Sequence, residues 1–158
     1  MRFLVAGGSD AVARARAPVR VLLAFGALAL AAFAVQRTLQ GGLLPSGVEA
    51  RYLAGGEPMP PAALWEELHA GAFLYGFLLF LLASILAASP AAPRLRAALL
   101  GVAFAATVAD LLAPFAVVAA GGGGIVRVAT FVAAVGALAI HLAVSAMAFG
   151  RAGRNGRA

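Results

Sequence analysis

Residues 65–88, WEELHAGAFLYGFLLFLLASILAA, constrain the fold of this chain more than any other stretch. The stretch carries no charged residue after His69. About 20 residues at 1.5 Å each cross the ~30 Å hydrocarbon core of a bilayer, so residues 70–88 predict a membrane-spanning helix. The aromatic and polar side chains at its entrance then lie near the membrane surface: Trp65, Glu66, Glu67 and His69.

Three further apolar runs accompany this one, so the chain is predicted to be an all-α, polytopic membrane protein with four transmembrane helices in an antiparallel bundle. The composition agrees, because 63% of the residues are hydrophobic and 11% are charged, whereas soluble domains are about half apolar and a quarter charged. The transmembrane domain is expected at 17–150, between a cytoplasmic segment 1–16 and a cytoplasmic tail 151–158. Its spans are expected near 19–35, 66–88, 97–120 and 125–149, with an outer loop at 36–61 that glycine and proline interrupt.

The first apolar run, residues 19–35, has a second interpretation. Its arginine-rich front and its ending Ala32-Phe33-Ala34 also fit a secretory signal peptide with an A-x-A cleavage site. We expect the run to be retained, because it is long enough to span the membrane and because the charge pattern of the chain is consistent with its presence.

All 12 basic residues are arginines, and their distribution predicts the topology. Nine of them flank the predicted spans on one side, whereas Arg37, Arg51 and Arg127 lie on the other. Positively charged residues are enriched in cytoplasmic segments, so both termini are predicted to be cytoplasmic. The same bias explains the formal charge of +6 without a nucleic-acid partner, because no basic face interleaved with aromatic residues lies outside the membrane.

Small residues recur at intervals of four along the third and fourth predicted spans. On the third span these are Gly101, Ala105, Ala109 and Ala113, and on the fourth Ala129, Ala133 and Ala137 continue into His141 and Ser145. Rows of small residues let helices approach closely in a membrane. The two spans are therefore predicted to form an antiparallel hairpin that packs through these two rows.

Glu66 and His69 are three residues apart on one helix face, which is the spacing of the Glu-x-x-His metal motifs in helical bundles. A di-iron site needs two such motifs and extra carboxylates, and Asp110 is the one other acid within a span. The alternative interpretation is a polar collar at the outer interface, formed together with Trp65 and Glu67. No metal is therefore predicted, and Glu66 and His69 are the candidate ligands if one binds.

His69 and His141 are the two histidines of the chain and hence the candidate axial ligands of a haem. Counted along the helices from the outer surface, His69 lies about 9 Å deep and His141 about 23 Å deep. Both ligands of one iron must be close to each other, so no haem within a single chain is expected. A haem shared with another subunit is the remaining alternative.

Asp110 is expected about 14 Å below the outer surface, where a carboxylate is costly and usually faces a partner or a water-filled cavity. Pro114 lacks the N–H that would bond the Asp110 carbonyl, which predicts a helix kink and a free acceptor beside the acid. His141 lies within about 9 Å of the same depth, so Asp110, Pro114 and His141 form the predicted intramembrane polar site. The alternative is structural, with Asp110 bonded to Thr107 or to a backbone carbonyl and His141 bonded to Ser145.

Asp110 is expected to be neutral, because burial disfavours its charge and because no cation is expected within reach. If the glycine turn at residues 121–124 centres the hairpin, Asp110 lies opposite about residue 135. Arg127 would then lie about 12 Å nearer to the surface, which is farther than one side chain spans.

Three runs of the chain resemble a family of small four-helix bacterial inner-membrane proteins of uncharacterised function: LLPSGVEARYLAGGE, WEELHAGAFLYG and ADLLAP. The resemblance covers the chain from about residue 43 to the C-terminus. The recurring features of the family are an outer-loop tyrosine, a histidine that opens the second span, and an aspartate followed four residues later by proline. Here they correspond to Tyr52, His69, Asp110 and Pro114. Members often carry His-x-His where this chain has His69 and Gly71, so the resemblance implies no histidine pair, and it implies a bacterial cytoplasmic-membrane location without lending an activity.

These observations predict a non-enzymatic accessory or structural subunit of a larger membrane assembly, in contact with lipid and with other membrane subunits or copies of itself. The sequence shows no Ser-His-Asp spacing, no phosphate-binding loop and no paired carboxylates. No catalytic residue and no cofactor is therefore predicted. The alternatives are a transporter or proton-conducting module built around Asp110 and His141, and a redox subunit that holds haem or quinone.

Overall fold

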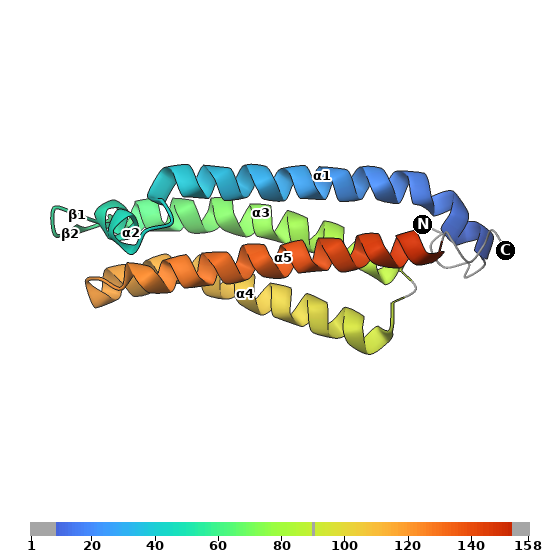
Figure 1. Cartoon of the computed structure of the whole chain (residues 1–158). Helices are drawn as coiled ribbons and strands as arrows, with labels where there is room; N and C mark the ends of the chain where they lie inside the picture. The colour runs from blue at the N-terminus through green and yellow to red at the C-terminus, as the bar shows by residue number, and fades with distance from the viewer. Residues whose placement is uncertain (1–8, 90, 153–158) are drawn as a thin grey trace.

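The computed structural model describes residues 9–89 and 91–152, which form four long helices, one short helix and a small hairpin (Figure 1). In chain order these are α1 (Ser9–Gly41), α2 (Pro45–Tyr52), β1 (Leu53–Ala54), β2 (Glu57–Pro58), α3 (Pro61–Ala87), α4 (Pro93–Ala120) and α5 (Gly124–Ala152). Residues 1–8 of the predicted N-terminal segment and residues 153–158 of the predicted tail lie outside the described residues.

The helices α1, α3, α4 and α5 lie side by side and alternate in direction along the chain (Figure 1). Each contains an apolar stretch of 25 to 28 residues with a mean hydropathy of 2.0 to 2.2. At 1.5 Å per residue, each stretch exceeds the ~30 Å hydrocarbon core of a bilayer. The predicted all-α, four-helix membrane fold is therefore confirmed, whereas the orientation of the chain in the membrane stays a prediction.

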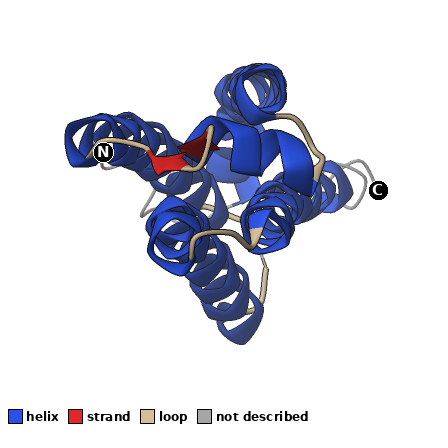
Figure 2. Cartoon of the chain, turned by 90° about the vertical axis from the view of Figure 1, so that its left-hand side faces the viewer, coloured by secondary structure: helices blue, strands red, loops and turns tan. Residues whose placement is uncertain are grey.

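The predicted outer loop is largely structured. Its first residues continue α1 to Gly41, and α2 and the β1–β2 hairpin follow. The hairpin pairs Leu53 with Pro58 across a turn in which Gly55 and Gly56 have φ angles of 65° and 88°, and two successive positive φ values are what a two-residue hairpin turn requires. Seen end-on, α2 and the hairpin lie across one end of the bundle (Figure 2), which we call the α2 end.

The turn between α4 and α5 is built at the α2 end from glycine and from one acid of α2. Gly121 ends α4 in the left-handed conformation at φ 65°, where glycine has no steric penalty. Glu49 Oε1 accepts hydrogen bonds from the backbone N–H groups of Gly123 and Gly124 at 3.1 and 3.0 Å. A Cβ atom at Gly124 would lie 2.3 Å from the Pro45 carbonyl oxygen, so this close approach of α5 to α2 requires glycine.

The hairpin of α4 and α5 is confirmed, because these two helices share the most extensive contact in the structure. The predicted small-residue interface is wrong for most of the two rows: Gly101, Ala105 and Ala109 are exposed on α4, and Ala129 and Ala133 are exposed on α5. A row that repeats every four residues rotates about 40° per step around a helix of 3.6 residues per turn. The buried positions of α5 instead alternate steps of three and four, which keeps them on one face: Arg127, Phe131, Ala134, Leu138, His141 and Ser145.

The apolar core lies between α1, α3 and α5, with Ala103 contributed by α4. Phe33 of α1 and Tyr75 of α3 pack edge to face with ring centroids 4.8 Å apart, and Leu82 and Leu138 are completely buried next to them. Tyr75 and Phe131 belong to this core and also contact polar residues toward the α2 end. The core thus packs directly against charged side chains, because Tyr75 contacts Asp110 and Phe131 contacts Arg127.

Candidate functional site: a charged network at the α2 end

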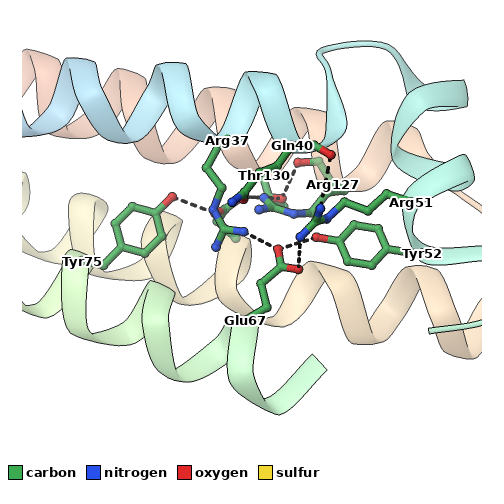
Figure 3. A network of polar contacts seen from close by, with 9 residues as sticks. Arg37, Gln40, Arg51, Tyr52, Glu67, Tyr75, Arg127 and Thr130 are labelled. Carbon is green, nitrogen blue, oxygen red and sulfur yellow. Dashed lines mark hydrogen bonds and ion pairs between the residues drawn. The ribbon is translucent and has the colours of Figure 1, made fainter. Parts of the chain in front are cut away.

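Glu67 of α3 joins three helices through its carboxylate (Figure 3). It forms ion pairs with Arg37 of α1 and with Arg51 of α2, the latter with Arg51 Nη2 and Glu67 Oε2 3.1 Å apart. The hydroxyl of Tyr52 donates a hydrogen bond to Glu67 Oε1 at 2.6 Å. One carboxylate is therefore shared between two guanidinium groups and one phenol.

Asp110 of α4 connects α4 with α3 and α5 through its carboxylate. Arg127 of α5 forms an ion pair with Asp110 Oδ1, and Tyr75 of α3 donates a hydrogen bond to Asp110 Oδ2 at 2.7 Å. Thr130 of α5 lies one turn from Arg127, with its Oγ1 3.4 Å from Asp110 Oδ1. Asp110 is 0% exposed and Arg127 6% exposed, so this ion pair is closed off from its surroundings.

The two groups of residues form one site, because a cavity of about 30 Å³ is lined by Arg37, Arg51, Tyr52 and Glu67 together with Arg127. We call the joined residues the charged network. It contains three arginines, two carboxylates and two tyrosines that donate hydrogen bonds to the carboxylates. Thr130 completes it, with its Oγ1 3.4 Å from Asp110 Oδ1 and 3.1 Å from the Arg127 carbonyl oxygen. Its members are Arg37, Arg51, Arg127, Glu67, Asp110, Tyr52, Tyr75 and Thr130. All of them except Asp110 are labelled in Figure 3. Every helix of the bundle, α2 included, contributes at least one of them.

Tyr52, like Arg51, lies on α2, outside the apolar stretches of the four long helices. Burial, and next the hydrogen bond to the Glu67 carboxylate, raise the pKa of Tyr52 above its usual range. The phenol is therefore neutral at ordinary pH and acts as a hydrogen-bond donor. It adds no negative charge to the network.

Gly71 provides the room that Arg37 needs beside α3. A Cβ atom at Gly71 would lie 2.7 Å from Leu111 Cδ2 and 3.0 Å from Arg37 Nη2. Real Cβ contacts are longer than the first of these distances, so a larger residue would displace the Leu111 side chain and crowd the guanidinium. The space beside Gly71 is thus filled by Leu111 of α4 and Arg37 of α1.

The prediction that Asp110 has no cation within reach is wrong, because Arg127 pairs with it. The error lies in the assumed register of the hairpin. Thr130 Oγ1 lies next to the Asp110 carboxylate, so Asp110 lies near the level of Thr130 rather than of residue 135. Arg127 is three residues, or about 4.5 Å along the helix, from that level, and an arginine side chain spans this distance. Asp110 therefore has a cationic partner, and the argument that it must be neutral for lack of one no longer holds.

The structure does not bring together Asp110 and His141 of the predicted polar site. His141 is 11 residues beyond Thr130 on α5, or about 16 Å farther along the helix. It is 0% exposed, and neither of its ring nitrogens has a hydrogen-bond partner among the described residues. Pro114 is buried inside α4, which continues as one helix through it.

The structural alternative for these residues also fails in its details. Ser145 Oγ has no hydrogen-bond partner among the described residues, so it does not bond His141. Thr107 donates its hydroxyl hydrogen bond to the Phe104 carbonyl oxygen at 2.9 Å rather than to Asp110. Asp110 is nevertheless bonded as a structural residue would be, through partners that the sequence did not reveal.

The remaining candidates lie apart from the charged network. Glu66 and His69 are both exposed on α3, and His69 Nδ1 lies 2.8 Å from the carbonyl oxygen of Trp65, one turn earlier on the same helix. Within the part of the chain that the structure describes, no group of three or more His, Asp or Glu side chains is arranged to hold a metal ion. The structure does not bring His69 and His141 together, because His69 is exposed two residues from Glu67 and His141 is enclosed in the core.

Sequence reasoning missed most of the charged network. The charge pattern of the sequence predicts Arg37, Arg51 and Arg127 only as residues that flank the spans, and it predicts Glu67 only as part of an interfacial collar. One signal could have identified Arg127: it falls on the alternating three-and-four pattern of buried positions that runs through Phe131 and Leu138. A charge on the buried face of a membrane helix requires a partner of opposite charge, and Asp110 is the one acid on the preceding span.

Comparison with known proteins places the chain in a family. The Aq_1264_TM family, described as a transmembrane helical domain, matches residues 42–150, and the chain belongs to it. The match includes every member of the charged network except Arg37. It confirms the resemblance drawn from the sequence. A comparison with curated proteins found no match, and a comparison with solved structures found none.

Proposed function

From its membership of a transmembrane helical domain family, we propose that the chain is a non-enzymatic accessory or structural subunit of a larger membrane assembly. The observation that carries the proposal is the pairing of the charged side chains with one another. Glu67 is held by two guanidinium groups and Asp110 by one. These ion pairs connect the helices of the bundle. A bundle whose helices are connected in this way can serve as a rigid surface against which other subunits pack.

The same pairing disfavours the transporter or proton-conducting alternative. A proton path across a membrane runs through a chain of titratable groups and water. The two residues proposed for it, Asp110 and His141, are separated by about 16 Å along the helix axis, and neither ring nitrogen of His141 has a hydrogen-bond partner among the described residues. Asp110 is occupied by Arg127, Tyr75 and Thr130.

The outward surface of α4 and α5 supports association with another helix. Gly101, Ala105 and Ala109 are exposed on α4, and Ala133 is exposed on α5. With no hydrophobic driving force between helices in lipid, close backbone approach at small residues is a main source of association. These residues do not form the internal interface, so they are free to face a neighbouring subunit.

The test compares the mass of the assembly in native membranes solubilised in mild detergent. We expect the parent chain to migrate as a species larger than its monomer, and Ala105→Leu and Ala133→Leu to release the monomer while their melting temperatures stay unchanged. Ala72→Leu on the exposed side of α3 is the matched control and should leave the assembly intact. A parent chain that is monomeric under these conditions contradicts the proposal.

The proposed setting is the bacterial cytoplasmic membrane, with both termini in the cytoplasm and no cofactor of its own. Alkaline phosphatase should be active when fused after Gly56 at the α2 end and inactive when fused after Arg151. The reverse pattern would overturn the orientation. A Soret band in the purified protein would overturn the absence of haem and favour a redox subunit.

A further inference from the structure

The excess positive charge of the network is confined to one of its two halves. Asp110 and Arg127 pair one to one, so their formal charges cancel. Glu67 is shared by Arg37 and Arg51, which leaves one positive charge without a carboxylate. Tyr52 does not balance this charge, because its phenol is neutral. Glu49, the one carboxylic acid of α2, is directed to the backbone N–H groups of Gly123 and Gly124.

A second cavity lies beside this uncompensated charge. It measures about 110 Å³ and is lined by Arg37, Gln36 and Gln40 of α1, by Arg51 of α2, and by Glu67 and Gly71 of α3. One water occupies about 30 Å³ in the liquid, so the cavity has room for a phosphate group. Gln36, Gln40 and Ala70 on its rim are exposed, so the cavity opens between α1 and α3 toward the outside of the bundle.

The side chains of this cavity offer hydrogen-bond donors beyond those that the network uses. A guanidinium group carries five N–H donors in a planar fork that matches phosphate oxygens. Arg37 directs Nη1 to Glu67, and Arg51 directs Nη2 to Glu67 and Nη1 to the Gln40 carbonyl oxygen. The side-chain amides of Gln36 and Gln40 add neutral donors at the rim.

We propose that this cavity binds the phosphate group of an anionic ligand, held by Arg37 and Arg51. A phosphate would neutralise the excess charge in a region of low dielectric, where an uncompensated charge is costly. Arg37 lies four residues before the end of the apolar stretch of α1, which is near the level of lipid headgroups when that stretch spans the bilayer. The phosphate can come from a lipid headgroup that enters between α1 and α3 or from a soluble phosphate. The inference is independent of the accessory role.

The experiment uses the full chain in a maltoside detergent, which contains no phosphate, and has two arms. One arm titrates inorganic phosphate at constant ionic strength by calorimetry, and the other adds phosphatidylglycerol or phosphatidylcholine and counts bound lipids by native mass spectrometry. Saturable binding of inorganic phosphate identifies a site that a free anion can fill. Saturable binding of phosphatidylglycerol alone identifies the lipid as the source, and either result supports the proposal. Absence of saturable binding in both arms overturns it.

Variants test whether the binding occurs at this cavity. Arg51→Gln should weaken binding about tenfold or more, because it removes a charged donor. Arg94→Gln, on α4 at the opposite end of the bundle, is the matched control and should bind as the parent does. Gln40→Glu places a repelling charge on the exposed rim without removing a network member, so it tests the site even if Arg51→Gln fails to fold. Binding to Gln40→Glu at the parent's affinity would overturn the assignment.

Discussion

Removing one partner of the buried Asp110–Arg127 pair should destabilise the bundle strongly. Asp110 is 0% exposed and Arg127 6% exposed, so Asp110→Asn leaves a buried guanidinium without its counter-charge. Breaking a buried ion pair in this way costs about 3–5 kcal/mol. Asp110→Leu should cost about 1–3 kcal/mol more, because the hydroxyl of Tyr75 then loses its acceptor as well.

A double-mutant cycle separates the pair from its surroundings. Arg127→Gln alone leaves a buried carboxylate unpaired, whereas Asp110→Asn with Arg127→Gln leaves two neutral amides in contact. We expect the double variant to be more stable than the sum of the single losses predicts, by about 1–3 kcal/mol. Arg94→Gln, combined with Asp110→Asn, is the control pair at the opposite end and should be additive.

The free energy of unfolding can be measured by titrating the purified protein from mild detergent into sodium dodecyl sulfate and following helix content. The result that refutes the reasoning is additivity of Asp110→Asn and Arg127→Gln to within about 0.5 kcal/mol, the range expected of independent sites. The two side chains would then not form the pair described here.

Three further predictions address the turn, the core and α2. Gly124→Ala should lower the melting temperature, because the new Cβ would lie 2.3 Å from the Pro45 carbonyl oxygen. The control Gly136→Ala meets no atom within 4 Å and should leave the melting temperature unchanged or raise it. Equal melting temperatures of the two variants would contradict the account of the turn. Leu82→Ala, at a fully buried position, should cost about 2–5 kcal/mol, and Leu112→Ala, 54% exposed, should cost far less in the same unfolding titration. In the variant Tyr75→Phe, Tyr52 is the one tyrosine left. Because folding raises the pKa of Tyr52, its contribution to stability is complete below about pH 10 and is lost as the pH rises through the folded-state pKa. Phenolate absorbance that appears at the same pH in folded and unfolded protein would contradict this.

The fold could be predicted from the sequence because a membrane leaves few choices. Four apolar runs long enough to cross a bilayer must be helices, since the backbone has to satisfy its hydrogen bonds internally. Short connections then make neighbouring helices antiparallel, as α4 and α5 are. The family resemblance, drawn from the runs that contain Tyr52, His69, Asp110 and Pro114, is also confirmed, because the family matches residues 42–150.

The charged network could not be predicted in the same way, because it depends on the register between helices. A shift of five residues, or about 7.5 Å along the helix, from residue 135 to Thr130, decides whether Arg127 reaches Asp110. The lengths of the helices and of the turn do not determine this shift. The start of α5 is held by contacts with α2, through Glu49 and through the close approach of Gly124 to Pro45. The pairing of Glu67 with Arg37, 30 residues apart in the chain, is equally a consequence of the packing of α1 on α3.

Proton flux through reconstituted protein tests most directly whether the buried charges hold the bundle together rather than move protons. Proteoliposomes that contain the parent chain and a pH-sensitive dye are given a pH gradient, and Asp110→Asn is compared with the parent after both are shown to be folded. We predict that the parent conducts protons no faster than liposomes without protein, and that Asp110→Asn does not differ from it. Proton flux through the parent that disappears in a folded Asp110→Asn variant would contradict the account and identify Asp110 as part of a proton path.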